Sequence, residues 1–178
     1  MRKLFISLLF IVLLCNISAA FAEIINVGLA AEYRPFVSYD YNNELTGLDV
    51  ELIKVIGEKE GFTPKFFDMA FDGLIESVSV GQIDLIAGAF SITPERQKEL
   101  LYADVYYTNE ALIIASTQSN IVNSLQLNQM TTYRLGVQRG TSFDQWVKTN
   151  LVSEGLISTQ NVYTFASLDS AVKDCGTA

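Results

Sequence analysis

Short apolar segments that suit β-strands alternate with segments of helical periodicity along most of this 178-residue chain. In its first half the pattern predicts strands at Ile24–Leu29, Thr63–Phe67 and Ile83–Ala87. Helices are predicted between them, from Asp49 to about Glu60 and from Asp72 to just before Gly81, where glycine suits a helix end. Strands separated by helices usually pair in parallel through βαβ crossovers, so the alternation predicts an α/β fold.

The alternation restarts after residue 107, which predicts a second lobe rather than one continuous sheet. The elements expected in this lobe are strands at Ala111–Ala115, Arg134–Val137 and Val162–Phe165 and helices at Phe143–Leu151 and Ser167–Asp174. We therefore place a first lobe at residues 23–107, a hinge at 108–111 and a second lobe at 112–178.

The N-terminus has the pattern of a secretory signal peptide. Arg2 and Lys3 precede an apolar run from Leu4 to Cys15, and Ala20-Phe21-Ala22 is a small-x-small cleavage site. A membrane-spanning helix needs about 20 apolar residues, so this run is too short to be an anchor. We expect residues 1–22 to be removed and the mature protein to be periplasmic.

Composition excludes several kinds of function. The chain has no histidine and two cysteines, of which only Cys175 remains after cleavage, so it lacks the usual ligands of a zinc site and the base of a Ser-His-Asp unit. A net charge of −8 argues against nucleic acid, which binds lysine- and arginine-rich surfaces. We expect no metal and no other cofactor.

The segment from Gly88 to Arg96 is the first candidate for a ligand site, because it follows a parallel strand at the edge where α/β sheets bind ligands. Gly88 and Ala89 are small enough for a ligand to approach the backbone, and Ser91 offers a hydroxyl group. Thr93-Pro94-Glu95 predicts a helix start, which would place Arg96 in a first turn that disfavours a cation. Its guanidinium could bind a carboxylate bidentately. A surface ion pair with Glu99, Asp104 or another local acid is the alternative.

A second candidate is Gly140-Thr141-Ser142, between a predicted strand and helix. Free N–H groups at a helix start can bind an anion, although an ordinary capped turn is the alternative. The aromatic residues Tyr33 and Phe71 stand near strand ends, where they could pack on a ligand side chain or belong to the core.

Four acidic residues show neither the spacing of a catalytic pair nor an accompanying base. They are Glu32, Asp49, Asp72 and Asp84. We predict structural roles instead, with Asp49 and Asp72 as helix caps and Asp84 at the start of a strand.

Several short motifs occur in register along residues 24–170. They are Tyr33-Arg34-Pro35-Phe36, Gly47-Leu48-Asp49-Val50-Glu51-Leu52, Phe71-Asp72-Gly73-Leu74-Ile75, Gly81-Gln82-Ile83-Asp84, Ser91-Ile92-Thr93-Pro94-Glu95-Arg96, Tyr102-Ala103-Asp104 with Tyr106-Tyr107, and Gly136-Val137 with Gly140-Thr141. In this set the chain resembles the family 3 extracellular solute-binding proteins, the periplasmic amino-acid receptors of ABC transporters.

The resemblance implies a two-lobed type II periplasmic-binding-protein fold that closes on a free amino acid, and it implies no enzymatic activity. It assigns Arg96 to binding of the ligand α-carboxylate, with assistance from Ser91, Gly140, Thr141 and Ser142. It further assigns Gly88 and Ala89 to contacts with the ligand ammonium group. Tyr33 and Phe71 are expected to pack on the ligand side chain. The implied partners are a polar free amino acid and an inner-membrane ABC permease, with the receptor acting as a monomer.

Two departures from the family pattern bear on function. Members that bind basic or amide side chains often carry an aspartate three residues before the first aromatic, where this chain has Ala30, so the ligand's identity stays open. The family also continues beyond the equivalent of Ala178, so we expect the second lobe and its return to the first to be incomplete. Two alternatives follow: a truncated, non-functional relic, and an enzyme that resembles cyclohexadienyl dehydratase.

Overall fold

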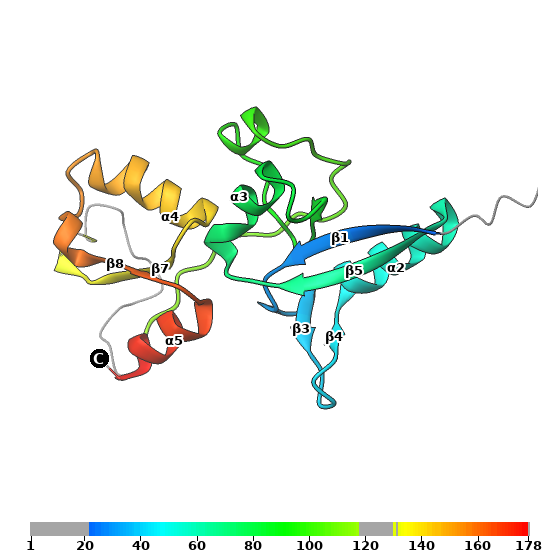
Figure 1. Cartoon of the computed structure of the whole chain (residues 1–178). Coiled ribbons are helices and arrows are strands. Elements are labelled where there is room, and N and C mark those ends of the chain that lie inside the picture. The colour runs from blue at the N-terminus through cyan, green and yellow to red at the C-terminus, as the bar shows by residue number, and fades with distance from the viewer. Residues whose placement is uncertain (1–21, 118–129, 131, 178) are drawn as a thin grey trace, which may run out of the picture.

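The computed structural model describes residues 22–117, 130 and 132–177 (Figure 1). The predicted signal peptide lies almost wholly outside these residues. Two groups of elements are present, each with a parallel pair of strands and its own buried apolar cluster. A segment without helix or strand, residues 101–117, follows the first group. The α/β prediction is confirmed, while the exact lobe and hinge boundaries stay predictions.

The first lobe is built on a parallel sheet with the strand order β5-β1-β6. Strand β1 (Glu23–Leu29) lies between β5 (Phe62–Asp68) and the short β6 (Leu85–Ile86) and runs parallel to both. Helix α2 (Leu48–Glu60) makes the crossover from β1 to β5 and ends at Gly61, whose left-handed φ of 83° lets its N–H bond the carbonyl of Gly57. This is the βαβ unit that the periodicity predicts.

A small antiparallel sheet is inserted between β1 and α2. It consists of β2 (Glu32–Tyr33), β3 (Val37–Tyr39) and β4 (Leu45–Thr46) in that order. Leu29, Phe36, Val37 and Val50 form one buried cluster that holds this insertion against β1 and α2. The segment before Phe36 therefore contains a short strand, which fixes the positions of Glu32 and Tyr33.

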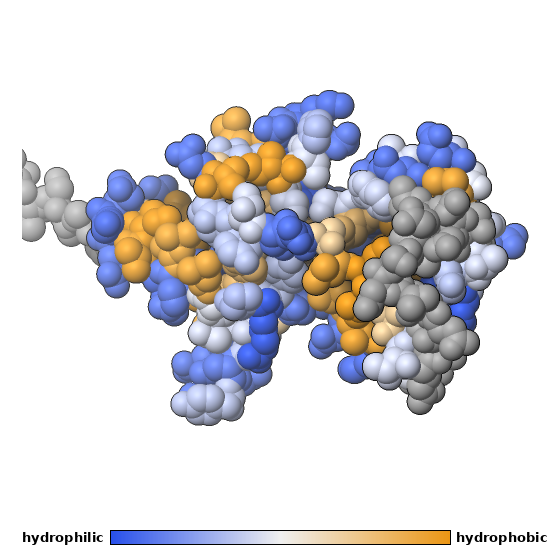
Figure 2. Space-filling model, turned by 180° about the vertical axis from the view of Figure 1, so that it is seen from behind, coloured by the Kyte–Doolittle hydropathy of each residue, from blue (hydrophilic) through white to orange (hydrophobic). Residues whose placement is uncertain are grey.

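Helix α2 buries less of its apolar surface than its sequence suggests. Val50 is fully buried, whereas Val55 is 47% and Ile56 is 37% exposed. Leu48 and Leu52 are exposed as well, so the spacing of these side chains leaves one apolar helix face uncovered, and apolar surface is visible over α2 in Figure 2. Val55 and Ile56 therefore do not belong to the core, and α2 contacts the sheet along a narrow stripe that includes Val50.

On the other side of β1, the chain forms the 3₁₀ turn η1 (Phe71–Gly73) and helix α3 (Leu74–Ser79). Ala30, Leu74 and Ile83 form a second buried cluster there, with Phe71 and Phe90 packed against it. Beyond β6 the helix predicted from Thr93 is only the 3₁₀ turn η2 (Arg96–Lys98). The segment that follows is mostly exposed, so a longer helix would have little tertiary packing to stabilise it.

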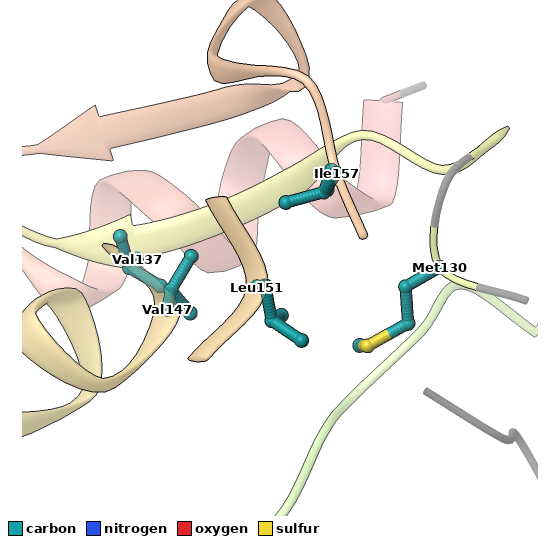
Figure 3. Close-up of a cluster of buried hydrophobic side chains, with 5 residues drawn as sticks. All are labelled: Met130, Val137, Val147, Leu151 and Ile157. Carbon is teal, nitrogen blue, oxygen red and sulfur yellow. The ribbon is translucent and has the colours of Figure 1, made fainter. Parts of the chain in front are cut away.

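The second lobe contains the parallel strands β7 (Leu135–Gln138) and β8 (Val162–Phe165). Between them lie α4 (Ser142–Val147), the π-helical turn η4 (Lys148–Val152) and the 3₁₀ turn η5 (Thr159–Asn161), and helix α5 (Leu168–Thr177) follows β8. The buried apolar cluster of this lobe, shown in Figure 3, consists of Met130, Val137, Val147, Leu151 and Ile157.

The strand predicted at Ala111–Ala115 does not form. Leu112, Ile113 and Ile114 are 84%, 61% and 62% exposed, and the described residues offer them no pairing strand. Their composition suits a buried strand, but a strand forms only where a neighbour satisfies its backbone groups.

In the described part of the chain, no helix has both the length and the apolarity to cross a bilayer.

Candidate functional site

Arg96 lies at the contact between the two lobes and is only 7% exposed. Its Nη1 donates to the carbonyl oxygen of Ser91 and its Nη2 to that of Gly140, both at 2.9 Å. The guanidinium carbon lies 4.0 Å from the ring centre of Phe90 and 5.5 Å from that of Phe71, within cation–π range of both. The second bond joins a first-lobe side chain to the second-lobe backbone.

The buried charge of Arg96 has no carboxylate partner in the described residues, because none of their ion pairs includes it. The alternative of a pair with Glu99 or Asp104 is therefore wrong for this arrangement. Burial lowers the pKa of the Arg96 guanidinium, and the nearby Tyr102 hydroxyl acts in the opposite direction. Arg96 also has more N–H donors than these two bonds use. The site thus holds a desolvated cation with spare donors.

The start of α4 faces Arg96 from the second lobe, but most of its polar groups form hydrogen bonds within the turn itself. Thr141 is the N-cap: its hydroxyl accepts from the N–H of Asp144 and donates to the carbonyl of Gln138. The N–H of Gly140 donates to the buried Asp144 carboxylate, which pairs with Lys148. The motif therefore forms an ordinary capped turn, the alternative to an anion site. The turn contributes the Gly140 carbonyl oxygen to the site.

Gly88 and Ala89 are held by a side chain that we predicted to cap a helix. The N–H groups of both residues donate to Oδ2 of Asp49, at 2.7 and 2.6 Å, and the Tyr106 hydroxyl donates to the same oxygen at 2.7 Å. Helix α2 has no side-chain cap, so the predicted role of Asp49 was wrong. Burial, followed by this hydrogen bond, raises the pKa of the Tyr106 hydroxyl strongly.

The predicted cap at Asp72 was also wrong, since neither η1 nor α3 has a side-chain cap. Instead Asp72 pairs with Arg139 of the second lobe at 3.3 Å. A Cβ atom added at Gly140 would lie 3.1 Å from the Cβ and 3.2 Å from the Cα of Asp72, so the two lobes approach closely here. Glycine is needed at position 140 for this approach and for its φ of 74°.

Two aromatic groups flank the contact between the lobes. Tyr33 stacks on Phe36 with ring centres 5.6 Å apart, and Tyr107 meets Phe36 edge-on at 4.9 Å. The Tyr33 hydroxyl accepts a hydrogen bond from Asn109 at 3.1 Å. Phe71 stacks on Phe90 rather than on Tyr33, with ring centres 5.3 Å apart. The two predicted aromatics therefore belong to separate groups.

Glu32 makes a third connection between the lobes. Its carboxylate accepts from Nε2 of Gln138 at 3.0 Å and from the backbone N–H of Leu168, at the start of α5, at 3.1 Å. Burial raises the pKa of Glu32, these two bonds oppose the shift, and the acids Asp169 and Asp68 add to it. No ion pair of the described residues involves Glu32.

The structure brings some of the predicted residues together around Arg96. Arg96 contacts Ser91, Gly140 and Phe71 directly, whereas no described contact joins Ser142 to it. Sequence reasoning missed Phe90 and Gln138, which lie next to the motifs and carry no distinguishing pattern. It singled out Asp49 and Glu32 but did not predict their contacts, because the partner residues lie 39 to 136 positions away in the chain.

The chain is similar in sequence to known proteins. Residues 25–174 match the family model of the bacterial extracellular solute-binding proteins, family 3. A putative ABC transporter arginine-binding protein 2 of Escherichia coli K12 is 34% identical over 132 residues, which are 74% of this chain and 53% of that protein. The histidine-binding periplasmic protein of the same strain is 29% identical over 98% of this chain and 70% of its own length. This chain spans about half the length of the first arginine-binding relatives.

Solved structures show the same fold. The structure of holo ArgBP from T. maritima matches with a TM-score of 0.76 and 30% identity, over 85% of this chain and 64% of that one. An ancestral amino-acid-binding protein, described as a precursor of cyclohexadienyl dehydratase, matches with a TM-score of 0.74 and 26% identity over 85% of this chain and 65% of that one. The predicted type II periplasmic-binding-protein fold is confirmed, and it is partial relative to these neighbours.

The match over residues 25–174, the two α/β lobes and the likeness to amino-acid-binding proteins agree with one another. This chain belongs to the bacterial extracellular solute-binding proteins, family 3.

Proposed function

We propose that this protein binds a free amino acid between its two lobes in the periplasm and delivers it to an inner-membrane ABC importer. One observation carries the proposal: Arg96 is buried at the lobe contact without a carboxylate partner among the described residues. Burying an unpaired cation is costly, so the site favours an anionic group. The α-carboxylate of an amino acid supplies that charge and suits the planar guanidinium fork.

The carboxylate subsite in this proposal consists of Arg96, Ser91 and the turn Gly140-Thr141-Ser142. Arg96 keeps N–H donors beyond those that bond the carbonyls of Ser91 and Gly140. The Gly140 bond ties the same guanidinium to the second lobe, so a ligand carboxylate on Arg96 would be enclosed as the lobes meet. Hinge closure around a ligand is the work of the protein, and no bond is made or broken.

The ammonium subsite consists of the backbone at Gly88 and Ala89. Their N–H groups face Asp49, which leaves carbonyl oxygens as the groups available to a cation. Tyr33 and Phe71 flank the ligand side chain in this proposal. Both stand in aromatic pairs whose faces suit an aliphatic stem or a flat cationic group.

A basic amino acid fits the site best. Glu32 lies at the lobe contact with Asp169 and Asp68 near enough to raise its pKa, and it accepts only from neutral donors. A cationic side chain would relieve this repulsion. Names of relatives that bind arginine and histidine support the same ligand class. L-arginine is therefore the first ligand to test.

Isothermal calorimetry of the mature protein against the common amino acids tests the proposal, with Arg96→Lys as the key variant. Lysine keeps the charge and loses the fork, so we expect at least about tenfold weaker binding. Arg139→Lys is the matched control, because Arg139 is exposed and paired with Asp72, and we expect less than about threefold change. Wild-type affinity in Arg96→Lys and Arg96→Ala would reject the role of Arg96.

The proposal includes the absence of catalysis, and a separate assay addresses it. The likeness to a dehydratase precursor makes arogenate and prephenate the substrates to test. We expect neither to be turned over, since Arg96 forms no ion pair with an acid in the described residues. Turnover that Arg96→Lys abolishes would favour the enzyme instead.

A further inference from the structure

Asp49 is one of the few buried acids of the described residues, with an exposed fraction of 3%. Its Oδ2 accepts three short hydrogen bonds, from the N–H groups of Gly88 and Ala89 and from the Tyr106 hydroxyl. Its Oδ1 has no hydrogen-bond partner in the described residues. Asp49 therefore connects the first turn of α2 to the backbone after β6, 39 residues away.

The backbone at Gly88 and Ala89 has an unusual conformation that Asp49 stabilises. Gly88 has a φ of 121° and Ala89 a φ of 50°, which is rare for a residue with a Cβ. Consecutive N–H groups that converge on one anion form a nest. A positive φ is strained for alanine, so the two hydrogen bonds to a carboxylate help to hold this geometry.

The orientation of these N–H groups determines where the Gly88 carbonyl points. The peptide bond between Gly88 and Ala89 is trans, since Arg34–Pro35 is the cis bond of the described residues. In a trans peptide the C=O and N–H are antiparallel, so the Gly88 carbonyl points away from Asp49. No hydrogen bond of the described residues ends on this oxygen.

We propose that Asp49 is a positioning residue for recognition of the ligand's ammonium group, acting through the peptide that joins Gly88 and Ala89. The inference rests on the proposed function and names a residue that acts behind its ammonium subsite. The carboxylate fixes the peptide orientation, so that the Gly88 oxygen faces away from the protein interior as an acceptor. Asp49 itself does not touch the ligand.

The charge of Asp49 contributes as well as its shape. The Asp49 carboxylate bonds the Ala89 N–H, and the Gly88 C=O of the same peptide would bond the ligand ammonium. In such a chain each hydrogen bond polarises the next. The negative charge thus increases the acceptor strength of the Gly88 oxygen. Burial makes this effect larger than it would be in water, because the local dielectric constant is low. The Tyr106 hydroxyl keeps its proton and serves as a third donor to Asp49, since its pKa is strongly raised.

Calorimetry with two probes separates this role from general stability. The probes are L-arginine and 5-guanidinopentanoate, which is arginine without its α-ammonium group. Asp49→Asn removes the charge at nearly constant shape. We expect it to weaken L-arginine binding by about tenfold and 5-guanidinopentanoate binding by less than about twofold. Asp84→Asn is the control, because Asp84 also accepts a backbone N–H, from Asn26 at 2.7 Å, away from Gly88.

Equal weakening of both probes would show a merely structural role and overturn the proposal, as would unchanged affinity for L-arginine. If wild-type protein bound the two probes equally well, the ammonium subsite would be absent and the proposal would fail. If it bound neither probe and no other common amino acid, the proposed function would fail first, and this role of Asp49 with it.

Amide hydrogen exchange checks the variant's fold and the local geometry. Asp49→Asn should keep global protection while the Gly88 and Ala89 amides exchange faster. If those two amides kept wild-type protection while L-arginine binding weakened, the effect would not run through this peptide and the proposal would be overturned. Tyr106→Phe, which leaves the Asp49 charge in place, should change L-arginine affinity less than Asp49→Asn does.

Discussion

The Gly140 carbonyl oxygen accepts a hydrogen bond from Nη2 of Arg96 at 2.9 Å, and this bond joins the turn before α4 to the buried cation of the first lobe. The same turn lies against Asp72, whose backbone is close to the position of a Cβ at residue 140. One glycine therefore contacts both the buried Arg96 guanidinium and Asp72 of the first lobe.

Gly140→Ala should impair both stability and ligand binding. Gly140 and Gly155 share a positive φ, of 74° and 67°, but a Cβ at Gly155 would meet nothing within 4 Å. Backbone strain alone should cost each variant about 1–2 kcal/mol in the free energy of unfolding. Only Gly140→Ala should also weaken binding, because its Cβ must displace Asp72. Urea unfolding and calorimetry measure the two effects, and identical behaviour of both variants would contradict the lobe contact.

Glu32→Gln should change how stability depends on pH. Burial raises the pKa of Glu32 above its ordinary value of 4.5, so between these two values the folded protein holds a proton that the unfolded chain has lost. The free energy of unfolding therefore falls as pH rises through this window in the wild type, and it should fall less in Glu32→Gln. Urea unfolding from pH 4 to pH 7 measures the difference. Glu58→Gln, on the exposed side of α2, should follow the wild type.

Tyr106→Phe should remove part of the alkaline loss of stability. Burial and the hydrogen bond to Asp49 raise the pKa of Tyr106 above 10.0, so the folded state retains a proton that the unfolded state releases near that pH. The free energy of unfolding of the wild type therefore falls above pH 10. Unfolding at high pH, with tyrosinate absorbance as a second readout, should show a smaller fall in Tyr106→Phe. Tyr41→Phe is the control, because Tyr41 is 96% exposed. A wild-type-like alkaline profile in Tyr106→Phe would refute this.

Leu151→Ala should destabilise the second lobe. Leu151 is fully buried between Met130, Val137, Val147 and Ile157 (Figure 3). Truncating a buried leucine leaves a cavity and typically costs about 2–5 kcal/mol in the free energy of unfolding. Leu101→Ala removes the same atoms from a fully exposed position and should stay within about 0.5 kcal/mol of the wild type. Equal losses in the two variants would show that this cluster is not a core.

Most regular elements could be predicted from local pattern. Strands β1, β5, β7 and β8 and helices α2 and α5 lie within about three residues of the expected ranges. Apolar periodicity, Gly61 and the turn before α4 are local signals, and they suffice where an element packs on its sequence neighbours. The segment Ala111–Ala115 shows the limit, since a strand also needs a partner that its own composition does not supply.

The candidate site was predictable in its members and not in its contacts. Arg96, Gly140 and Gly88 stood out because of their residue types and their positions after strands. Asp49 looked like a helix cap, because its position next to α2 is local and its donors on Gly88 and Ala89 are not. Phe90 gave no signal, since an aromatic residue between small ones reads as ordinary core.

The amino-acid sequence alone determined the α/β class, the two-lobed organisation and the family motifs that point to amino-acid binding. Those properties depend on periodicity and residue type within short windows. Only the tertiary structure decided that Arg96 has no acidic partner among the described residues and bonds Gly140 instead, and that Asp49 fixes the peptide after Gly88. Such contacts join residues tens of positions apart, and their energies depend on burial and on distances that arise only when the lobes pack together.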